Sequence, residues 1–312
     1  MTLFQAIVLG IVQGLTEFIP ISSTAHLVFA ARAAGLYQGV ETNLRAEQTT
    51  ATIAVIQLGT LLAVLVYFGR DILHISQAFL REHLAIIRGS PTTAAAATHS
   101  DNRLGTPVWD TSKHRLSPEA WLGWLVIIGS LPVAVLGLLF RKQIEGTLTK
   151  NLWVIATMMI VVAVLLGIAE LVGKRTRSLA ELGAGDALAV GFAQALALIP
   201  GASRSGSTIM AGLFAGQLRE TAARFSFLLS IPAIAASGIL ELKAAILKLP
   251  ADSYPSLAVA TFVSGVVGYA SIWFLLRFLR THSTGIFIFY RLIVGGLILF
   301  ALSTGYLSAS MN

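Results

Sequence analysis

Long apolar segments, separated by short polar or basic ones, run through most of the chain. Six of them have about the 20 residues that an α-helix needs to cross the roughly 30 Å hydrocarbon core of a bilayer. These segments are residues 51–68, 121–140, 152–172, 225–247, 256–276 and 286–306. The pattern predicts an all-α membrane protein with six transmembrane helices.

Two further apolar regions, at about 3–35 and 186–216, are interrupted by Pro20 and by Pro200. Their halves, at 3–19, 21–35, 186–199 and 209–216, are each shorter than a full span. We interpret each region as a re-entrant pair of helices that enters and leaves the membrane on one side. Such irregular backbone is tolerated where protein or a water-filled cavity covers it. One long kinked helix is the alternative for the first region.

The two interrupted regions resemble each other in sequence. Gln13 and Ser22 flank the proline of the first region much as Gln194 and Ser203 flank that of the second. An odd number of predicted spans separates the two regions, so they would enter the membrane from opposite faces. This is the arrangement of an inverted-topology repeat, whose interface lies near the middle of the membrane.

Composition agrees with this class of protein. The chain of 312 residues is 55% hydrophobic and only 12% charged, which excludes a soluble domain and favours a single integral-membrane domain over residues 1–312. It contains no cysteine, which excludes disulfides, thiolate metal sites and thiol nucleophiles. A polar, aperiodic stretch at about 89–117 is predicted to be a loop.

Most lysines and arginines outside the spans fall in loops on one side of the predicted topology, among them Lys174, Arg175 and Arg177. Because cytoplasmic loops of membrane proteins carry an excess of positive charge, we expect the loop at 89–117 inside and both termini outside. The net charge of +7 therefore does not indicate nucleic acid as a partner.

The first interrupted region carries Gln13, Glu17, Ser22, Ser23 and His26 within fourteen residues. Ionisable groups are costly in a membrane and mark functional sites by default. On helices, residues three or four apart share a face, so Gln13 lies near Glu17, and both serines lie near His26.

The second region carries Ser203, Arg204, Ser205 and Thr208 directly after its break at Pro200. A helix N-terminus, a guanidinium fork and several hydroxyls together are suited to phosphate oxygens. Ordinary helix capping is the alternative role of the hydroxyls, and an ion pair with Glu17 is that of Arg204. We expect the two regions to meet and form one site.

Several roles are open within that site. Glu17 could hold a divalent cation or orient the histidine. His26 could be nucleophile, general base or general acid, and Ser22 or Ser23 could be a nucleophile that His26 activates. Gln13 could be a weak metal ligand, a donor to the substrate or a purely structural hydrogen-bonding group.

These residues carry a resemblance to a known family. The runs at 13–26, 55–59, 200–208, 225–229 and 290–291 resemble undecaprenyl-diphosphate phosphatases of the bacitracin-resistance type. Both family motifs, Glu/Gln-xxx-Glu and Pro-Gly-x-Ser-Arg-Ser-x-x-Thr, are matched. Gln13 stands where many members have Glu, which weakens a site with two carboxylates, and Ile53 stands where many carry an acid.

The resemblance implies a hydrolase in the bacterial plasma membrane. It would release the terminal phosphate of a C55 polyprenyl diphosphate, so that the monophosphate re-enters cell-wall synthesis. A divalent cation, Mg²⁺ or Ca²⁺, is the implied cofactor, with Glu17 as its ligand, while a homodimer is left open. The catalytic residues would be Glu17, Ser23 and His26. The residues that bind the substrate would be Gln13, Ser22, Thr24, Ser203, Arg204, Ser205 and Thr208.

A transporter or flippase for polyprenyl phosphate is the competing function, because inverted repeats with charges at mid-membrane are typical of transporters. The pairing of His26 with serines and a phosphate-binding arginine favours the enzyme. Release of inorganic phosphate would separate the two.

Overall fold

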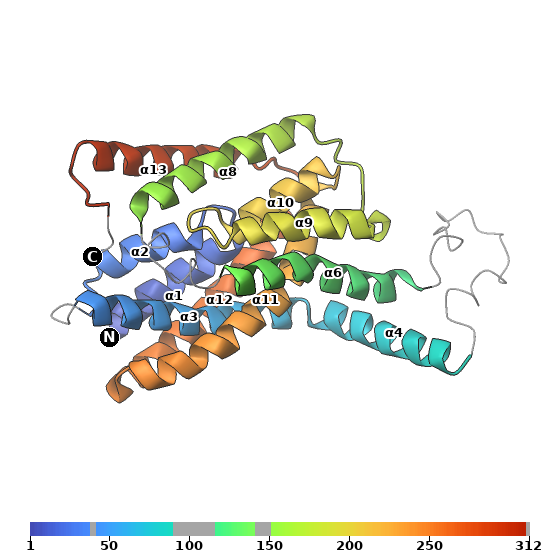
Figure 1. Ribbon diagram of the computed structural model, residues 1–312, viewed down its shortest axis with the longest axis horizontal. Helices are drawn as coiled ribbons and strands as arrows, with labels where there is room; N and C mark the ends of the chain where they lie inside the picture. Colours follow the sequence, from blue (N-terminus) through green and yellow to red (C-terminus); the bar gives the residue numbers. More distant parts are fainter. Residues whose placement is uncertain (38–41, 90–115, 141–150, 310–312) are drawn as a thin grey trace.

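We analysed a computed structural model that describes residues 1–37, 42–89, 116–140 and 151–309 (Figure 1). The described residues form α-helices and two short 3-10 helices, without a strand. Six helices are long and apolar enough to cross a membrane. They are α3 (Thr42–Tyr67), α6 (Pro118–Leu139), α8 (Leu152–Val172), α11 (Arg219–Lys248), α12 (Tyr254–Leu279) and α13 (Gly285–Ser303). The predicted all-helical class and the six candidate spans are confirmed.

The first interrupted region folds as a helical hairpin, which we call the first hairpin. It consists of α1 (Leu3–Phe18) and α2 (Ser23–Ala33). The side chain of Gln5, in the first turn of α1, donates to the carbonyl of Ala34 just after α2, at 2.8 Å. The chain therefore reverses at residues 19–22, and the alternative of one long kinked helix is wrong.

The second hairpin consists of α9 (Ala184–Leu196) and α10 (Arg204–Phe214), joined by the break at residues 197–203. Helix α10 begins earlier than the predicted start at residue 209. The reason is local, because Ser203 caps the helix by accepting a hydrogen bond from the backbone N–H of Gly206 at 3.2 Å. Arg204 and the hydroxyl residues after it are thus helical.

The two hairpins enter the bundle from opposite ends of its long axis, and their breaks meet near its middle (Figure 1). The two termini lie at the same end as the open end of the first hairpin. Helix α1 packs on α12 and α9 packs on α6, while α3 contacts α11 and α8 contacts α13. At Gly191 of α9, an added Cβ would lie 2.3 Å from the carbonyl oxygen of Gly129, so only glycine permits this approach.

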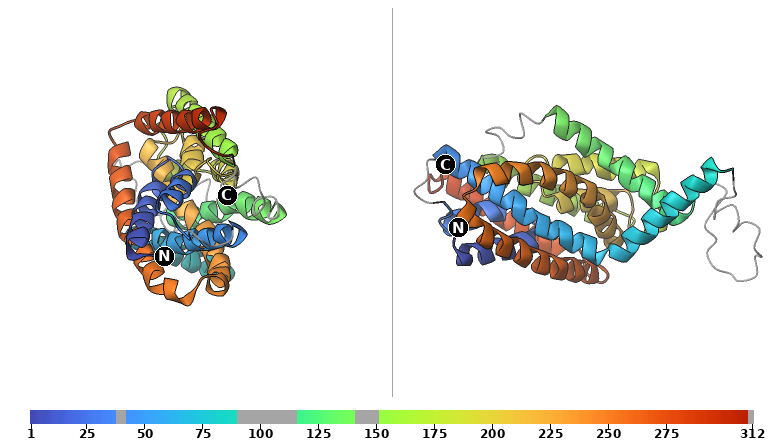
Figure 2. Two further views of the ribbon diagram at one scale, coloured as in Figure 1. Left: turned by 90° about the vertical axis from the view of Figure 1, so that its left-hand side faces the viewer. Right: turned by 90° about the horizontal axis from the view of Figure 1, so that it is seen from below.

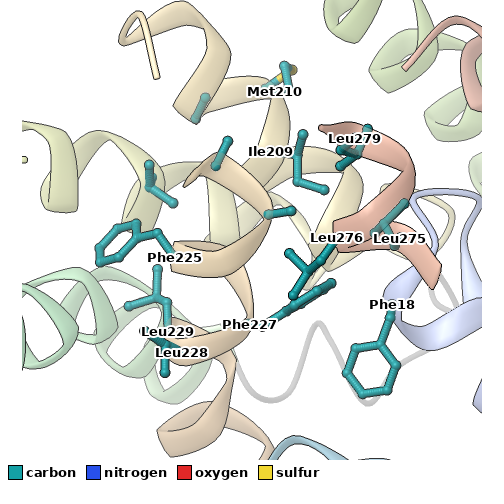
Figure 3. Packing of buried hydrophobic residues seen from close by; sticks show 14 of the residues in the cluster. Phe18, Ile209, Met210, Phe225, Phe227, Leu228, Leu229, Leu275, Leu276 and Leu279 are labelled. Atoms are coloured by element: carbon teal, nitrogen blue, oxygen red, sulfur yellow. The ribbon is translucent and has the colours of Figure 1, made fainter. Parts of the chain in front are cut away.

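Helix α4 (Gly69–Ile87) follows α3 and packs against α6, projecting past the rest of the bundle (Figures 1 and 2). The loop predicted at about 89–117 lies almost wholly outside the described residues. An apolar core connects the first break to the other helices. In it, Phe18 meets Phe227 edge-on with ring centroids 5.3 Å apart, beside residues of α10 and α12 (Figure 3). This packing fixes the end of α1 next to α11.

Candidate active site

An ion pair joins the two hairpins at their breaks. Oε1 of Glu17, at the end of α1, lies 2.7 Å from Nη2 of Arg204, the first residue of α10. Both side chains are largely buried, with 6% and 13% of their surface exposed. Amide groups complete the shell of the carboxylate, because Gln57 of α3 donates to Oε1 at 3.3 Å and Gln13 donates to Oε2 at 3.0 Å. The predicted meeting of the two motifs is therefore observed.

Three polar atoms at this junction are buried without a hydrogen-bond partner: Nη1 of Arg204, Oε1 of Gln13 and Oγ of Ser22. A buried donor or acceptor left unpaired costs about 1–3 kcal/mol, and more when it is charged. Native proteins rarely keep such groups unless a ligand or water satisfies them. The junction thus offers a guanidinium donor, a hydroxyl and an amide oxygen to a polar ligand.

Both breaks end in a serine with the same unusual backbone. Ser22 has φ +79° and Ser203 has φ +69°, a region that non-glycine residues rarely occupy. Each serine directly precedes a helix of eleven residues, α2 or α10. The free N–H groups and positive dipole ends of both helices therefore lie at the junction, where they favour an anion.

His26 is held from both sides of its ring. Nδ1 lies 2.7 Å from the carbonyl oxygen of Ser22, and Nε2 lies 2.7 Å from the hydroxyl of Tyr290. A carbonyl oxygen only accepts, so Nδ1 carries the hydrogen, and Nε2 is the nitrogen at which neutral His26 can gain a proton. The ring of His26 is thus hydrogen-bonded to the first break through the backbone carbonyl of Ser22.

The other predicted site residues differ in their burial and in whether their hydroxyls already have partners. Ser205 donates to the carbonyl of Ile19 at 3.4 Å and thereby bridges the two breaks. Thr208 bonds the hydroxyl of Ser226 at 2.5 Å and the carbonyl of Arg204 at 2.8 Å, so its hydroxyl already has partners within the protein. Ser23 is half-buried at the start of α2, and Thr24 is exposed on the same helix.

Arg291 is the main residue of the junction that the sequence analysis did not assign to the site. It is fully buried on α13 and donates to carbonyl oxygens of three segments. Its partners are Pro20 in the first break, Gly201 and Ala202 in the second, and Met158 and Met159 of α8. A lone arginine inside an apolar span is the signal that would have identified it. Its charge adds to that of Arg204, so the junction favours anions.

Among the described residues, no group of three or more histidine, aspartate or glutamate side chains could hold a metal ion. The junction offers the Glu17 carboxylate, with the unpaired Oε1 of Gln13 on the amide bonded to it. One carboxylate with few further oxygens is a set that Mg²⁺ accepts when phosphates and waters supply the other ligands. This donor set would hold a divalent cation only together with a phosphate-bearing ligand and water, because Arg204, Gln57 and Gln13 already donate to the Glu17 carboxylate.

Comparison with known proteins gives a consistent result. The family model described as bacitracin resistance protein BacA matches residues 6–297. A protein of Syntrophobacter fumaroxidans named undecaprenyl-diphosphatase is 50% identical over 299 residues, covering 96% of this chain and 97% of its own. Proteins of the same name from Chlorobium phaeovibrioides and Mycolicibacterium gilvum are 45% and 44% identical, covering 98% and 99% of this chain and 99% and 100% of their own. The chain, which has six candidate membrane-spanning helices, therefore belongs to the bacitracin-resistance BacA family of integral membrane proteins.

Proposed function

We propose that the protein hydrolyses undecaprenyl diphosphate to undecaprenyl phosphate and inorganic phosphate, which returns the lipid carrier to cell-wall synthesis. The names of its relatives support this activity. The observation in the structure that carries the proposal is the guanidinium of Arg204. Nη2 is held by Glu17, while Nη1 is buried and unpaired beside two helix N-termini. A diphosphate supplies the oxygens that such a group lacks.

In this proposal, Arg204, Ser22 and the N–H groups of α2 and α10 bind the diphosphate. His26 takes or returns a proton at Nε2. The attacking group is a serine, His26 or water; the sequence favours Ser23, and the unpaired hydroxyl of Ser22 makes that residue a second candidate. Rapid quenching with labelled substrate distinguishes them. Acid-stable phosphoserine would support a serine, acid-labile phosphohistidine would support His26, and product without labelled protein would support water.

A divalent cation is part of the proposal, with Glu17 and Gln13 as its protein ligands. When bound, it neutralises phosphate charge and polarises the scissile bond. Calorimetric titration with Mg²⁺ or Ca²⁺ tests the assignment without reference to turnover. Binding in the presence of a non-hydrolysable diphosphate should be lost in Glu17→Gln, and equal binding by this variant would exclude Glu17 as a ligand.

We also propose that the two hairpins are re-entrant and related as an inverted-topology repeat in the plasma membrane. The helix contacts support this. The first helix of each hairpin packs on a spanning helix from the other half of the sequence, α1 on α12 and α9 on α6. The described end of the bundle that carries Lys174, Arg177 and Arg219 would face the cytoplasm. Reporter fusions at Asn312 and near Ser100 test the orientation, and a cytoplasmic signal at Asn312 would contradict it.

The decisive experiment measures inorganic phosphate released from undecaprenyl diphosphate by the purified protein. Arg204→Lys keeps the charge but loses the planar fork, so turnover should fall on the order of 10²-fold. Arg224→Lys is the matched control, because Arg224 forms its ion pair with Asp71, at 2.7 Å, rather than with Glu17. Transport of polyprenyl phosphate without phosphate release would instead support a flippase.

A further inference from the structure

Helix α13 brings a tyrosine to the catalytic histidine of the proposed reaction. The hydroxyl of Tyr290 lies 2.7 Å from Nε2 of His26, and the two rings are nearly parallel, with 16° between their planes. Tyr290 is 264 positions from His26 in the sequence, so only the tertiary structure forms this pair. Tyr290 is 39% exposed, so part of its side chain is open to water or a ligand.

The hydroxyl of Tyr290 contacts Nε2, the ring nitrogen of His26 at which a proton can be gained. Because the carbonyl of Ser22 fixes the hydrogen on Nδ1, a neutral His26 can gain a proton only at Nε2. The hydroxyl of Tyr290 donates to that nitrogen in the neutral state. Any account of His26 as a general base must therefore include Tyr290.

A second histidine in the molecule shows what is special about a hydroxyl partner. Nδ1 of His83 lies 2.6 Å from the carbonyl of Phe79, and its Nε2 accepts from the indole N–H of Trp124 at 3.0 Å. An indole only donates, so His83 cannot gain a proton at Nε2 and keep this bond. A hydroxyl both donates and accepts, so the His26–Tyr290 bond survives when Nε2 is protonated.

We propose that Tyr290 orients the His26 ring, remains bonded to Nε2 in both protonation states and passes the proton between the attacking group and that nitrogen. The attacking hydroxyl or water gives its proton to the Tyr290 oxygen while the Tyr290 hydrogen passes to Nε2, and the new N–H then donates back to that oxygen. The tyrosine is neutral before and after this exchange, and the leaving lipid phosphate takes a proton when the same transfer runs in reverse. This inference rests on the proposed role of His26.

The test compares Tyr290→Phe, His26→Gln and the double variant, with thermal unfolding to confirm that each folds. Phenylalanine retains the ring but removes the hydroxyl, so kcat should fall about tenfold or more while KM changes by less than about twofold. In the His26→Gln background, Tyr290→Phe should cause no further loss, because Tyr290 acts through His26. Tyr269→Phe, which alters another partly exposed tyrosine, is the matched control.

A second readout does not depend on turnover. Diethyl pyrocarbonate modifies unprotonated imidazole nitrogens, so His26 should react several-fold faster in Tyr290→Phe when followed by peptide mass spectrometry, while His83 serves as an internal reference. Wild-type kcat in Tyr290→Phe beside an inactive His26→Gln would overturn the role of Tyr290 and leave the proposed function intact. Additive losses in the double variant would also overturn it. Full activity of His26→Gln would instead overturn the proposed role of His26.

Discussion

The first and second hairpins share a backbone plan but carry different chemistry. In each, a buried glutamine, Gln13 or Gln194, precedes the break, and a serine with positive φ starts the next helix. The first hairpin then supplies a carboxylate and an imidazole, whereas the second supplies a guanidinium and hydroxyls. At its own break, neither hairpin holds both an anion-binding cation and a proton acceptor, so the site is complete only where the two breaks meet.

The two hairpins also differ in the side-chain contacts that join their two helices at the open end. Arg177 binds both carboxylate oxygens of Asp186 at 2.7 Å and the carbonyl of Ala215 at 3.0 Å, which ties the start of α9 to the end of α10. The hydrogen bonds and charge of Asp186 raise the pKa of the Arg177 guanidinium above its ordinary value. At the open end of the first hairpin, the side chain of Gln5 donates to the carbonyl of Ala34, a bond between neutral groups. We therefore expect the second hairpin to be the more rigid half of the site.

The largest effect on turnover is expected for Glu17, the carboxylate that the first hairpin contributes. Glu17→Gln removes the negative charge between Arg204 and the proposed cation, so turnover should fall on the order of 10³-fold. The amide can still accept from Arg204, so we expect thermal unfolding to remain cooperative. Phosphate release and unfolding are measured on the same sample. Activity that survives both this substitution and a strong chelator would remove the cation from the mechanism.

The next effect concerns the residue that joins the hairpins. Arg291→Lys cannot reach carbonyls of both breaks and of α8 at once, since lysine lacks the planar fork. Each abandoned buried carbonyl costs about 1–3 kcal/mol, so the free energy of unfolding should fall by about 3 kcal/mol or more. Arg277→Lys on α12, where the guanidinium stacks over Trp273, is the control. An equal loss of unfolding free energy in both variants would contradict the conclusion that Arg291 joins the two hairpins.

The two positive-φ serines give a matched pair. Ser22→Ala removes a hydroxyl with no partner in the protein, so it should lower turnover, on the order of tenfold, and change stability by less than about 0.5 kcal/mol. Ser203→Ala removes a helix cap and should cost about 1 kcal/mol of stability with a smaller effect on turnover. Turnover and unfolding are measured for both, and the reverse pattern would assign the ligand contact to Ser203.

The smallest effects test the difference in rigidity. Arg177→Ala should lower the free energy of unfolding by about 1–2 kcal/mol, an amount reduced by the partial exposure of this ion pair. Gln5→Ala should cost about 0.5–1 kcal/mol, since it removes neutral hydrogen bonds at an exposed helix end. Hydrogen exchange of α1–α2 and α9–α10 measures the local effect. Faster exchange in the second hairpin of the wild-type protein would contradict this expectation.

Much of the architecture follows from the sequence alone. The length and apolarity of the six segments determine that they are helices of membrane-spanning length, because an isolated apolar segment satisfies its backbone in a membrane only as a helix. Proline lacks the N–H of a continuous helix and so favours the breaks at Pro20 and Pro200. It does not decide them alone, because Pro132 and Pro232 lie inside α6 and α11. The predicted spans and hairpin helices agree with the structure to within about three residues at most ends. The exceptions are early starts: α3 begins at residue 42 rather than 51, α11 at 219 rather than 225 and α10 at 204 rather than 209.

The tertiary structure decided which polar side chains of the site already have hydrogen-bond partners and which have none. The sequence offers Ser22, Ser205 and Thr208 as equivalent hydroxyls, but packing gives partners to Ser205 and Thr208 and leaves Ser22 without one. It also places Tyr290 and Arg291, from the last span, against His26 and both breaks. Spacing along a helix predicts neighbours only within one or two turns, whereas these contacts depend on how distant helices pack. That is why the residue types of the site could be read from the sequence, and its hydrogen-bond network could not.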